Sequence, residues 1–177
     1  MSELDEAWAL ALSEAERQAR LAGRRDIADY LSLKNSNDLL RKAGVDWLLA
    51  EFTLLAGDAN RAGAGIQISK QEGHRFRTGN STMVGHLLTL TNGVRTLYVE
   101  AGWPRTPRDG VVRGGGLACA SIRHLGIRNA SQEFLLKKSH NGAPAWQMSG
   151  TKHTLHESDM HRHLRILLDQ HHARNVL

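Results

Sequence analysis

Apolar side chains recur at helical spacing near both ends of the chain and alternate with polar ones in the middle. The first helical pattern covers residues 3–24, and residues 26–33 continue as a shorter helix. The apolar face of the first pattern consists of Trp8, Leu12, Ala15 and Ala19. Asn35-Ser36-Asn37 then predicts a break, and Gly44 predicts the end of a further short helix. The N-terminal part, residues 1–62, is therefore predicted to be mainly helical.

The most apolar stretch is residues 46–56, which contain Trp47, Phe52 and four leucines. Such a run fits a buried helix and a central strand equally well, because periodicity does not separate the two. Asp46 as a cap before the run and Gly57-Asp58 after it favour a helix. The same ambiguity holds for residues 117–125, for which we expect a strand.

Alternation of apolar and polar residues begins after Gly63 and predicts strands. We expect one strand over residues 66–70, a turn at Glu72-Gly73 and a second strand over 74–77. The clearest hairpin signal is Asn92-Gly93 between residues 86–91 and 94–99, which predicts a type I′ turn. This loop would pair Thr91 with Val94, and it would place Leu88, Leu90, Leu97 and Val99 on one buried face.

Further strands are predicted over residues 132–138 and 145–148, and the helical pattern returns over residues 153–172. The sequence therefore predicts an α+β protein with N-terminal helices, a central antiparallel sheet of about five strands in residues 63–148, and a C-terminal helix. No repeat or long linker divides the chain, so residues 1–177 are expected to form a single domain.

Overall composition indicates where the protein is located more than what it does. Hydrophobic content of 41% and charged content of 23% are ordinary for a globular chain. No apolar run approaches the ~20 residues that cross a bilayer. The acidic N-terminus does not resemble a secretory signal, and Cys119 is the single cysteine. We therefore expect a cytoplasmic protein without a membrane partner.

Positive charge is concentrated between His74 and Ala130. This stretch has eight arginines, no lysine and two acids, for a net charge of +6, whereas the whole chain carries +5. The planar guanidinium suits bidentate contact with phosphate and stacks on aromatic rings and bases, and Trp103 could stack on a base too. The predicted nucleic-acid-binding residues are Arg75, Arg77, Arg95, Trp103, Arg105, Arg108, Arg113 and Arg123.

A second group of polar residues lies near the C-terminal helix. Glu157 and His161 are four residues apart, a spacing at which a helix can present both to a metal ion, and His156 and His163 flank them. The metal-protease pattern His-Glu-x-x-His is not present, and one helix rarely supplies more than two ligands. These four residues are weak metal candidates, and we favour a polar helix face with charge pairs four residues apart. No cofactor is predicted.

The sequence therefore favours a binding protein over an enzyme. We expect an arginine-rich sheet or loop surface that binds nucleic acid or another polyanion, in a protein that acts alone or as a subunit of a larger assembly. One alternative is an interaction or structural subunit that docks on an acidic protein. Another is a small enzyme acting on a phosphorylated or nucleotide substrate, with arginines holding the anion and histidines transferring protons. The sequence does not distinguish RNA from DNA.

Overall fold

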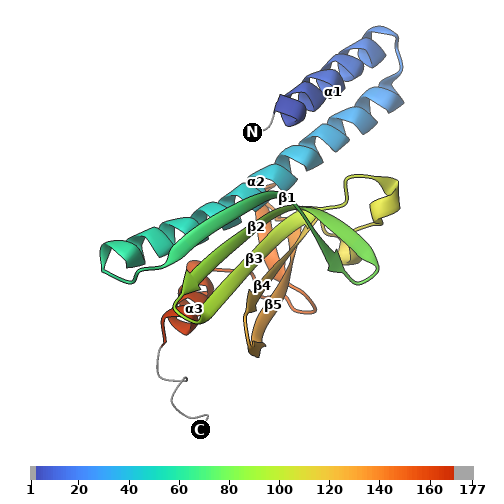
Figure 1. Cartoon of the computed structure of the whole chain (residues 1–177). Coiled ribbons are helices and arrows are strands. Elements are labelled where there is room, and N and C mark those ends of the chain that lie inside the picture. Colours follow the sequence, from blue (N-terminus) through green and yellow to red (C-terminus); the bar gives the residue numbers. More distant parts are fainter. Residues whose placement is uncertain (1–2, 170–177) are drawn as a thin grey trace.

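The computed structural model describes residues 3–169, which form three helices and a six-stranded antiparallel sheet (Figure 1). The elements follow the order α1 (Glu3–Leu21), α2 (Arg25–Arg61), β1 (Gln67–Thr78), β2 (Ser81–Asn92), β3 (Arg95–Trp103), β4 (Ala118–His124), β5 (Ile127–Lys138), β6 (Pro144–Met148) and α3 (Glu157–Leu168). Two short 3-10 turns, η1 (Pro107–Asp109) and η2 (Arg113–Gly115), lie between β3 and β4. The predicted α+β fold is confirmed, with six strands instead of about five.

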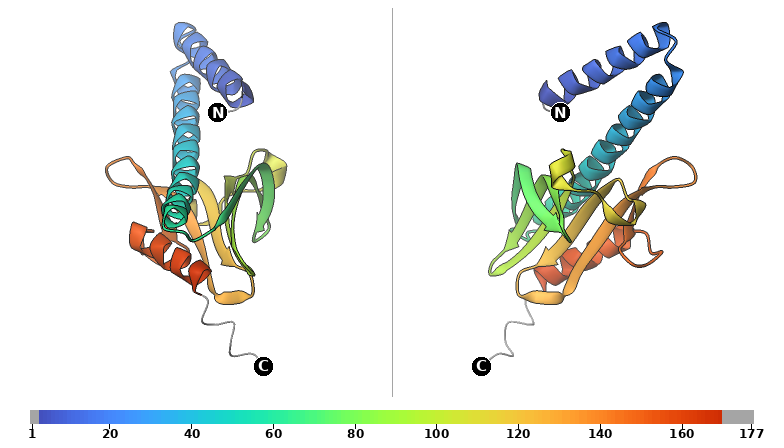
Figure 2. Two further views of the ribbon diagram at one scale, coloured as in Figure 1. Left: turned by 60° about the vertical axis from the view of Figure 1, so that its left-hand side comes forward. Right: turned by 90° about the vertical axis from the view of Figure 1, so that its right-hand side faces the viewer.

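The sheet is a meander in which every strand pairs with its neighbours in the sequence. One face packs against the C-terminal half of α2 and against α3, and the sheet curves around these helices (Figure 2). Apolar side chains from β2 to β6 fill this core, with Phe134, Leu136 and Trp146 among the largest. The N-terminal half of α2 extends past the sheet and pairs with α1 as a helical hairpin (Figure 1). None of the helices in the described residues combines the length and the apolar composition that a bilayer crossing requires.

Helix α2 is one continuous helix, so the predicted break at residues 35–37 and the predicted end at Gly44 are wrong. Residues 46–56 belong to the same helix, as favoured above, although Trp47 is 43% exposed. The glycine at position 44 serves packing. A Cβ there would lie 2.6 Å from Leu136 Cδ1, and the Gly44 carbonyl accepts a hydrogen bond of 2.9 Å from Trp146 Nε1. Contact with the sheet therefore overrides the local helix-breaking signals.

Strand β1 is also continuous, so the predicted turn at Glu72-Gly73 is wrong. The pairing with β2 shifts register between Glu72 and His74, which makes Gly73 part of a β-bulge with a φ of 67°. Glycine adopts this conformation without strain, which is why it stands at a bulge as readily as at a turn.

The β2–β3 hairpin forms where it was predicted, but with a different loop. Asn92 pairs with Arg95, and Thr91 pairs with Thr96 instead of Val94. The two-residue loop is Gly93-Val94, in which Gly93 alone has a positive φ, of 59°. This is the pattern of a type II′ turn and not of the predicted type I′ turn. The shift is two residues, so the buried face is the predicted one, with Leu88, Leu90, Leu97 and Val99 in the core.

The C-terminal part agrees closely with the predicted pattern. Residues 117–125 contain strand β4, and β5 begins five residues earlier than predicted, at Ile127. Helix α3 begins at Glu157 instead of residue 153, because the preceding residues form a loop that bridges to β6 at Gln147 and Thr154. Residues 170–172 of the predicted helix lie outside the described residues.

Candidate nucleic-acid interface

Five of the predicted arginines lie at one end of the sheet, which we call the basic end (Figure 1). Arg75 and Arg77 lie on β1 near the β1–β2 turn, and the other three lie in the loop from β3 to β4. That loop is held against the hairpin, because Ser81 Oγ donates to the Val111 carbonyl at 2.8 Å and accepts from the Val111 amide at 3.2 Å. The arginines of the basic end are Arg75, Arg77, Arg105, Arg108 and Arg113.

Asp109 organises the loop and joins it to β1. Its Oδ2 accepts hydrogen bonds from the backbone amides of Arg105 and Thr106 and from the Thr106 hydroxyl, and its Oδ1 accepts one from Arg75 at 2.8 Å. Burial acts to raise the pKa of Asp109, but the hydrogen bonds from Thr106, Arg105 and Arg75 outweigh it and lower that pKa. The ionised carboxylate therefore neutralises one arginine and fixes the loop around it.

Three arginines of the basic end keep their guanidinium groups available. Arg77, Arg108 and Arg113 are exposed, and none has a side-chain partner within residues 3–169. Asp109 is the one acidic residue in the strand ends and loops at this end, residues 75–84, 103–117 and 136–144. This surface therefore holds positive charge that the described part of the chain does not compensate.

The same end contains two lysines that sequence reasoning missed. Lys137 and Lys138 end β5, and the antiparallel order places the end of β5 beside the start of β4. They lie 24 residues or more from the arginines of the β3–β4 loop in the sequence, so a search for a charged stretch passed over them. A strand-end search would have found them once the meander order was known.

Trp103 and Arg105 form a stacked pair at the start of the β3–β4 loop. The Arg105 guanidinium carbon lies 3.8 Å from the centre of the Trp103 ring, and Arg105 Nε donates to the Val84 carbonyl at 3.4 Å. Burial lowers the pKa of Arg105, with smaller opposing effects from Asp5 and Asp38, and Asp5 of α1 lies 3.9 Å away. Part of the stacking and hydrogen-bonding capacity of the Arg105 guanidinium is therefore already used by contacts within the chain.

The stacked pair faces a groove between the helical hairpin and the sheet. Two adjoining hollows of about 450 Å³ and 930 Å³ share Asp5, Lys42, Asp46, His86 and Arg105 as lining residues. His86 Nδ1 is buried without a hydrogen-bond partner in the described residues, and burial lowers the pKa of His86, with Lys70 adding to the effect. The groove therefore presents a neutral imidazole beside an arginine and a tryptophan.

Two predicted arginines do not belong to the basic end. Arg95 donates to the Ile166 carbonyl at 2.8 Å, near the C-terminus of α3, where a positive charge complements the helix dipole. Arg123 lies on the outer face of the sheet, where it donates to Glu100 at 3.0 Å and its guanidinium carbon lies 5.3 Å from the centre of the Tyr98 ring. Both positions are explained by contacts within the chain.

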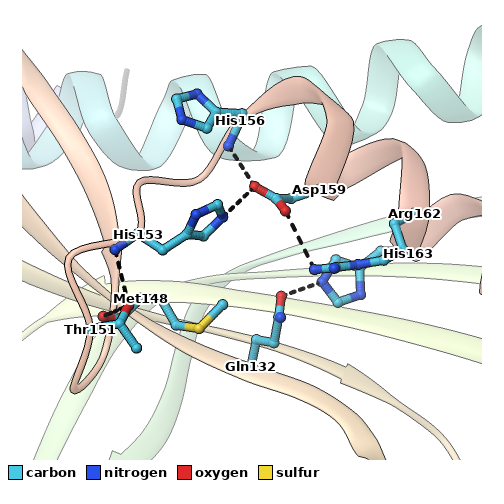
Figure 3. Close-up of polar contacts among 8 residues, drawn as sticks. All are labelled: Gln132, Met148, Thr151, His153, His156, Asp159, Arg162 and His163. Atoms are coloured by element: carbon cyan, nitrogen blue, oxygen red, sulfur yellow. Dashed lines mark hydrogen bonds and ion pairs between the residues drawn. The ribbon is translucent and has the colours of Figure 1, made fainter.

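The four weak metal candidates do not form one site, and Figure 3 shows two of them, His156 and His163, pointing in different directions. His161 contacts Glu157 on the exposed side of α3 at 3.2 Å, which is the side-chain pair at a spacing of four residues expected on a polar helix face. His156 is the N-cap residue, and its amide donates to Asp159, which also contacts His153 at 2.8 Å. The described residues contain no group of three or more histidine, cysteine or acidic side chains that could hold a metal ion.

The remaining candidate, His163, points the other way, into the core. Its Nε2 contacts Gln132 Oε1 at 2.8 Å and its Nδ1 contacts His124 Nε2 at 3.0 Å. The amide oxygen only accepts, so His163 donates to Gln132 and accepts from His124. Burial lowers the pKa of both imidazoles to about 4, with Arg95 adding to the effect on His124. This buried neutral pair was not predicted from the sequence, because its members are 39 residues apart.

Cys119 and the triple glycine Gly114-Gly115-Gly116 have structural roles. Cys119 is buried in a small second core with Phe76 and Met83 on the outer face of the sheet, and burial raises the pKa of its thiol to about 11. Gly114 adopts a φ of 77° and lies close to Leu135, so the triple glycine shapes the loop that covers this second core.

Comparison of the chain with protein-family models, with curated proteins and with solved structures finds no match. The geometry and charge of the basic end therefore carry the inference of function.

Proposed function

We propose that this protein binds nucleic acid through the basic end of its sheet. One observation carries the proposal: Arg77, Arg108 and Arg113 come from two separate segments to one end of the sheet and have no partner within the described residues. Guanidinium groups with free N–H donors are suited to phosphate oxygens, to which they donate in pairs. The hydrogen bonds of Asp109 hold the loop in place, so binding need not order it first.

The C-terminal histidines that the structure describes do not support the enzyme alternative. A phosphate-processing enzyme would need proton-transferring histidines beside the arginines that hold the anion. His153 and His156 lie away from the basic end, because β6 starts at that end and runs away from it before them, whereas His86 lines the groove beside Arg105. His163 points into the core. An acidic protein partner would contact the same arginines. Measuring the affinity of the protein for nucleic acid distinguishes that alternative from the proposal.

The test measures affinity for fluorescently labelled single-stranded and duplex oligonucleotides by anisotropy at fixed, low salt. The triple variant Arg77→Ala, Arg108→Ala, Arg113→Ala should bind at least tenfold more weakly, because each lost phosphate contact removes part of the counterion-release term. The matched control is Arg25→Ala, Arg128→Ala, Arg165→Ala. It removes the same charge from exposed arginines elsewhere and should bind within about threefold of wild type.

Two results would contradict the proposal. Absence of binding by the wild-type protein would remove nucleic acid as the partner, and equal losses in the two triple variants would show that net charge and not the basic end determines affinity. Far-ultraviolet circular dichroism of both variants checks that each remains folded.

A further inference from the structure

Strand β1 is an edge of the sheet, and no described element pairs with its outer side. The opposite edge, β6, is partly closed by the bridge between Gln147 and Thr154. Residues 67–72 of β1 are all exposed, and Ile68 retains 41% of its accessible surface. We call this segment, residues 67–72, the open edge. An exposed edge of this length presents unpaired backbone groups to any second strand.

The direction of the backbone groups on the open edge follows from the rest of the sheet. The Thr96 carbonyl accepts from the Leu125 amide, so the backbone groups of Thr96 point toward β4 and those of Leu97 toward β2. Because the direction of the backbone groups alternates along each strand, those of Leu87 and Thr89 on β2 point toward β1. Their partners on β1 are Gln71 and Ser69. The amides and carbonyls of Ile68, Lys70 and Glu72 consequently point away from the sheet.

We propose that the open edge pairs with the open edge of a second copy of this chain, antiparallel and centred on Gln71. This register sets Lys70 directly opposite Glu72 of the second copy, and by symmetry Glu72 opposite the other Lys70. Directly opposed unlike charges stabilise an antiparallel pair, and like charges destabilise it. Registers centred on Lys70 or on Glu72 would oppose like charges, and the register centred on Gln71 is the one that sets Lys70 directly opposite Glu72.

The surroundings of the open edge fit an isologous contact. Lys70 and Glu72 line the hollow of about 930 Å³ together with Ala50 and Leu54 of α2, and Leu54 is 60% exposed. In the proposed register both copies of α2 lie on the same side of one continuous sheet, so each Leu54 and Ile68 lies beside the joined edges. Charged side chains and a bulge often protect edge strands from pairing. Here the bulge at Gly73 limits the paired length, and the charges favour the register centred on Gln71.

The experiment measures the mass of the full chain in solution by sedimentation velocity or light scattering. Wild type should be a dimer. Lys70→Glu and Glu72→Lys should each weaken dimerisation by about tenfold or more, because each reversal acts twice in a symmetric interface. The double variant carrying both reversals should recover the dimer, since opposite charges face each other again. Lys152→Glu, an exposed reversal elsewhere, is the matched control and should leave the dimer intact.

A backbone variant tests the strand pairing independently of charge. Lys70→Pro removes an outward-pointing amide that the β1–β2 pairing does not use, so it should give a monomer with an unchanged circular dichroism spectrum. A wild-type monomer at the highest soluble concentration would overturn the proposal. So would a double charge reversal that stays as weak as the single ones while remaining folded.

Discussion

The buried pair of His124 and His163 should make the stability of this protein depend on pH. Both rings are almost fully buried, and they are neutral in the folded protein because burial lowers their pKa to about 4. In the unfolded chain an imidazole titrates near 6.5. The unfolded state therefore binds more protons between these two values, and stability falls as the pH decreases from about 6.5 to about 4. Above about pH 7.5 the pair contributes almost no pH dependence, because the imidazoles are then neutral in both states.

The size of the effect follows from the two pKa values. One imidazole with these values costs about 2 kcal/mol of unfolding free energy between pH 7.5 and pH 5, and two independent rings would cost about 4 kcal/mol. The shared hydrogen bond couples the rings, so we expect a loss of about 2–4 kcal/mol. For a domain of this size this corresponds to a decrease in melting temperature of roughly 5–15 °C.

Urea denaturation followed by tryptophan fluorescence at several pH values measures this dependence. The double variant His124→Gln, His163→Gln should be less stable at pH 7.5 but should lose much less stability on acidification, because the titrating pair is gone. The control His161→Gln removes an exposed imidazole and should keep the wild-type dependence. Equal wild-type stability at pH 5 and 7.5, or a double variant with the wild-type dependence, would refute the reasoning.

Three further predictions concern stability. Gly93→Val should lower the unfolding free energy by about 1 kcal/mol or more, because the hairpin loop needs the positive φ of Gly93. As a control, Val94→Ala at the exposed neighbour should change the unfolding free energy by less than ~0.5 kcal/mol. Gly85→Ala should lower the unfolding free energy by about 3 kcal/mol or more, because a Cβ there would lie 2.0 Å from the Ala101 carbonyl oxygen. As a control, Gly57→Ala in α2 should leave the unfolding free energy unchanged or raise it. A chelator should leave the melting temperature unchanged, and elemental analysis should find no stoichiometric zinc; about one zinc ion per chain would contradict this.

Periodicity predicted the fold class because it reports which face of an element is buried. The buried faces of β2 and β3 were correct even though their register was shifted by two residues, since a two-residue shift preserves the face. Local breaking signals misled where tertiary packing decides the outcome. Gly44 lies inside α2 because Leu136 and Trp146 approach it, and both follow it by more than 90 residues.

The candidate site was predictable in part. Charge counting found the arginines of the β1 strand and of the β3–β4 loop, and the meander brings these two segments together. Counting alone did not separate them from Arg95 and Arg123, whose contacts with Ile166 and Glu100 depend on the fold. Lys137 escaped notice because strand order, and not distance along the chain, places it at the basic end.

The salt dependence of oligonucleotide binding tests the central claim most directly. The logarithm of the association constant should fall linearly with the logarithm of salt concentration, with a slope that reports the number of phosphate contacts. We predict that the variant lacking Arg77, Arg108 and Arg113 has a slope smaller by about 2–3 units, which is close to one unit per lost contact. A slope equal to that of wild type would show that these arginines do not contact phosphate and would contradict the proposed function.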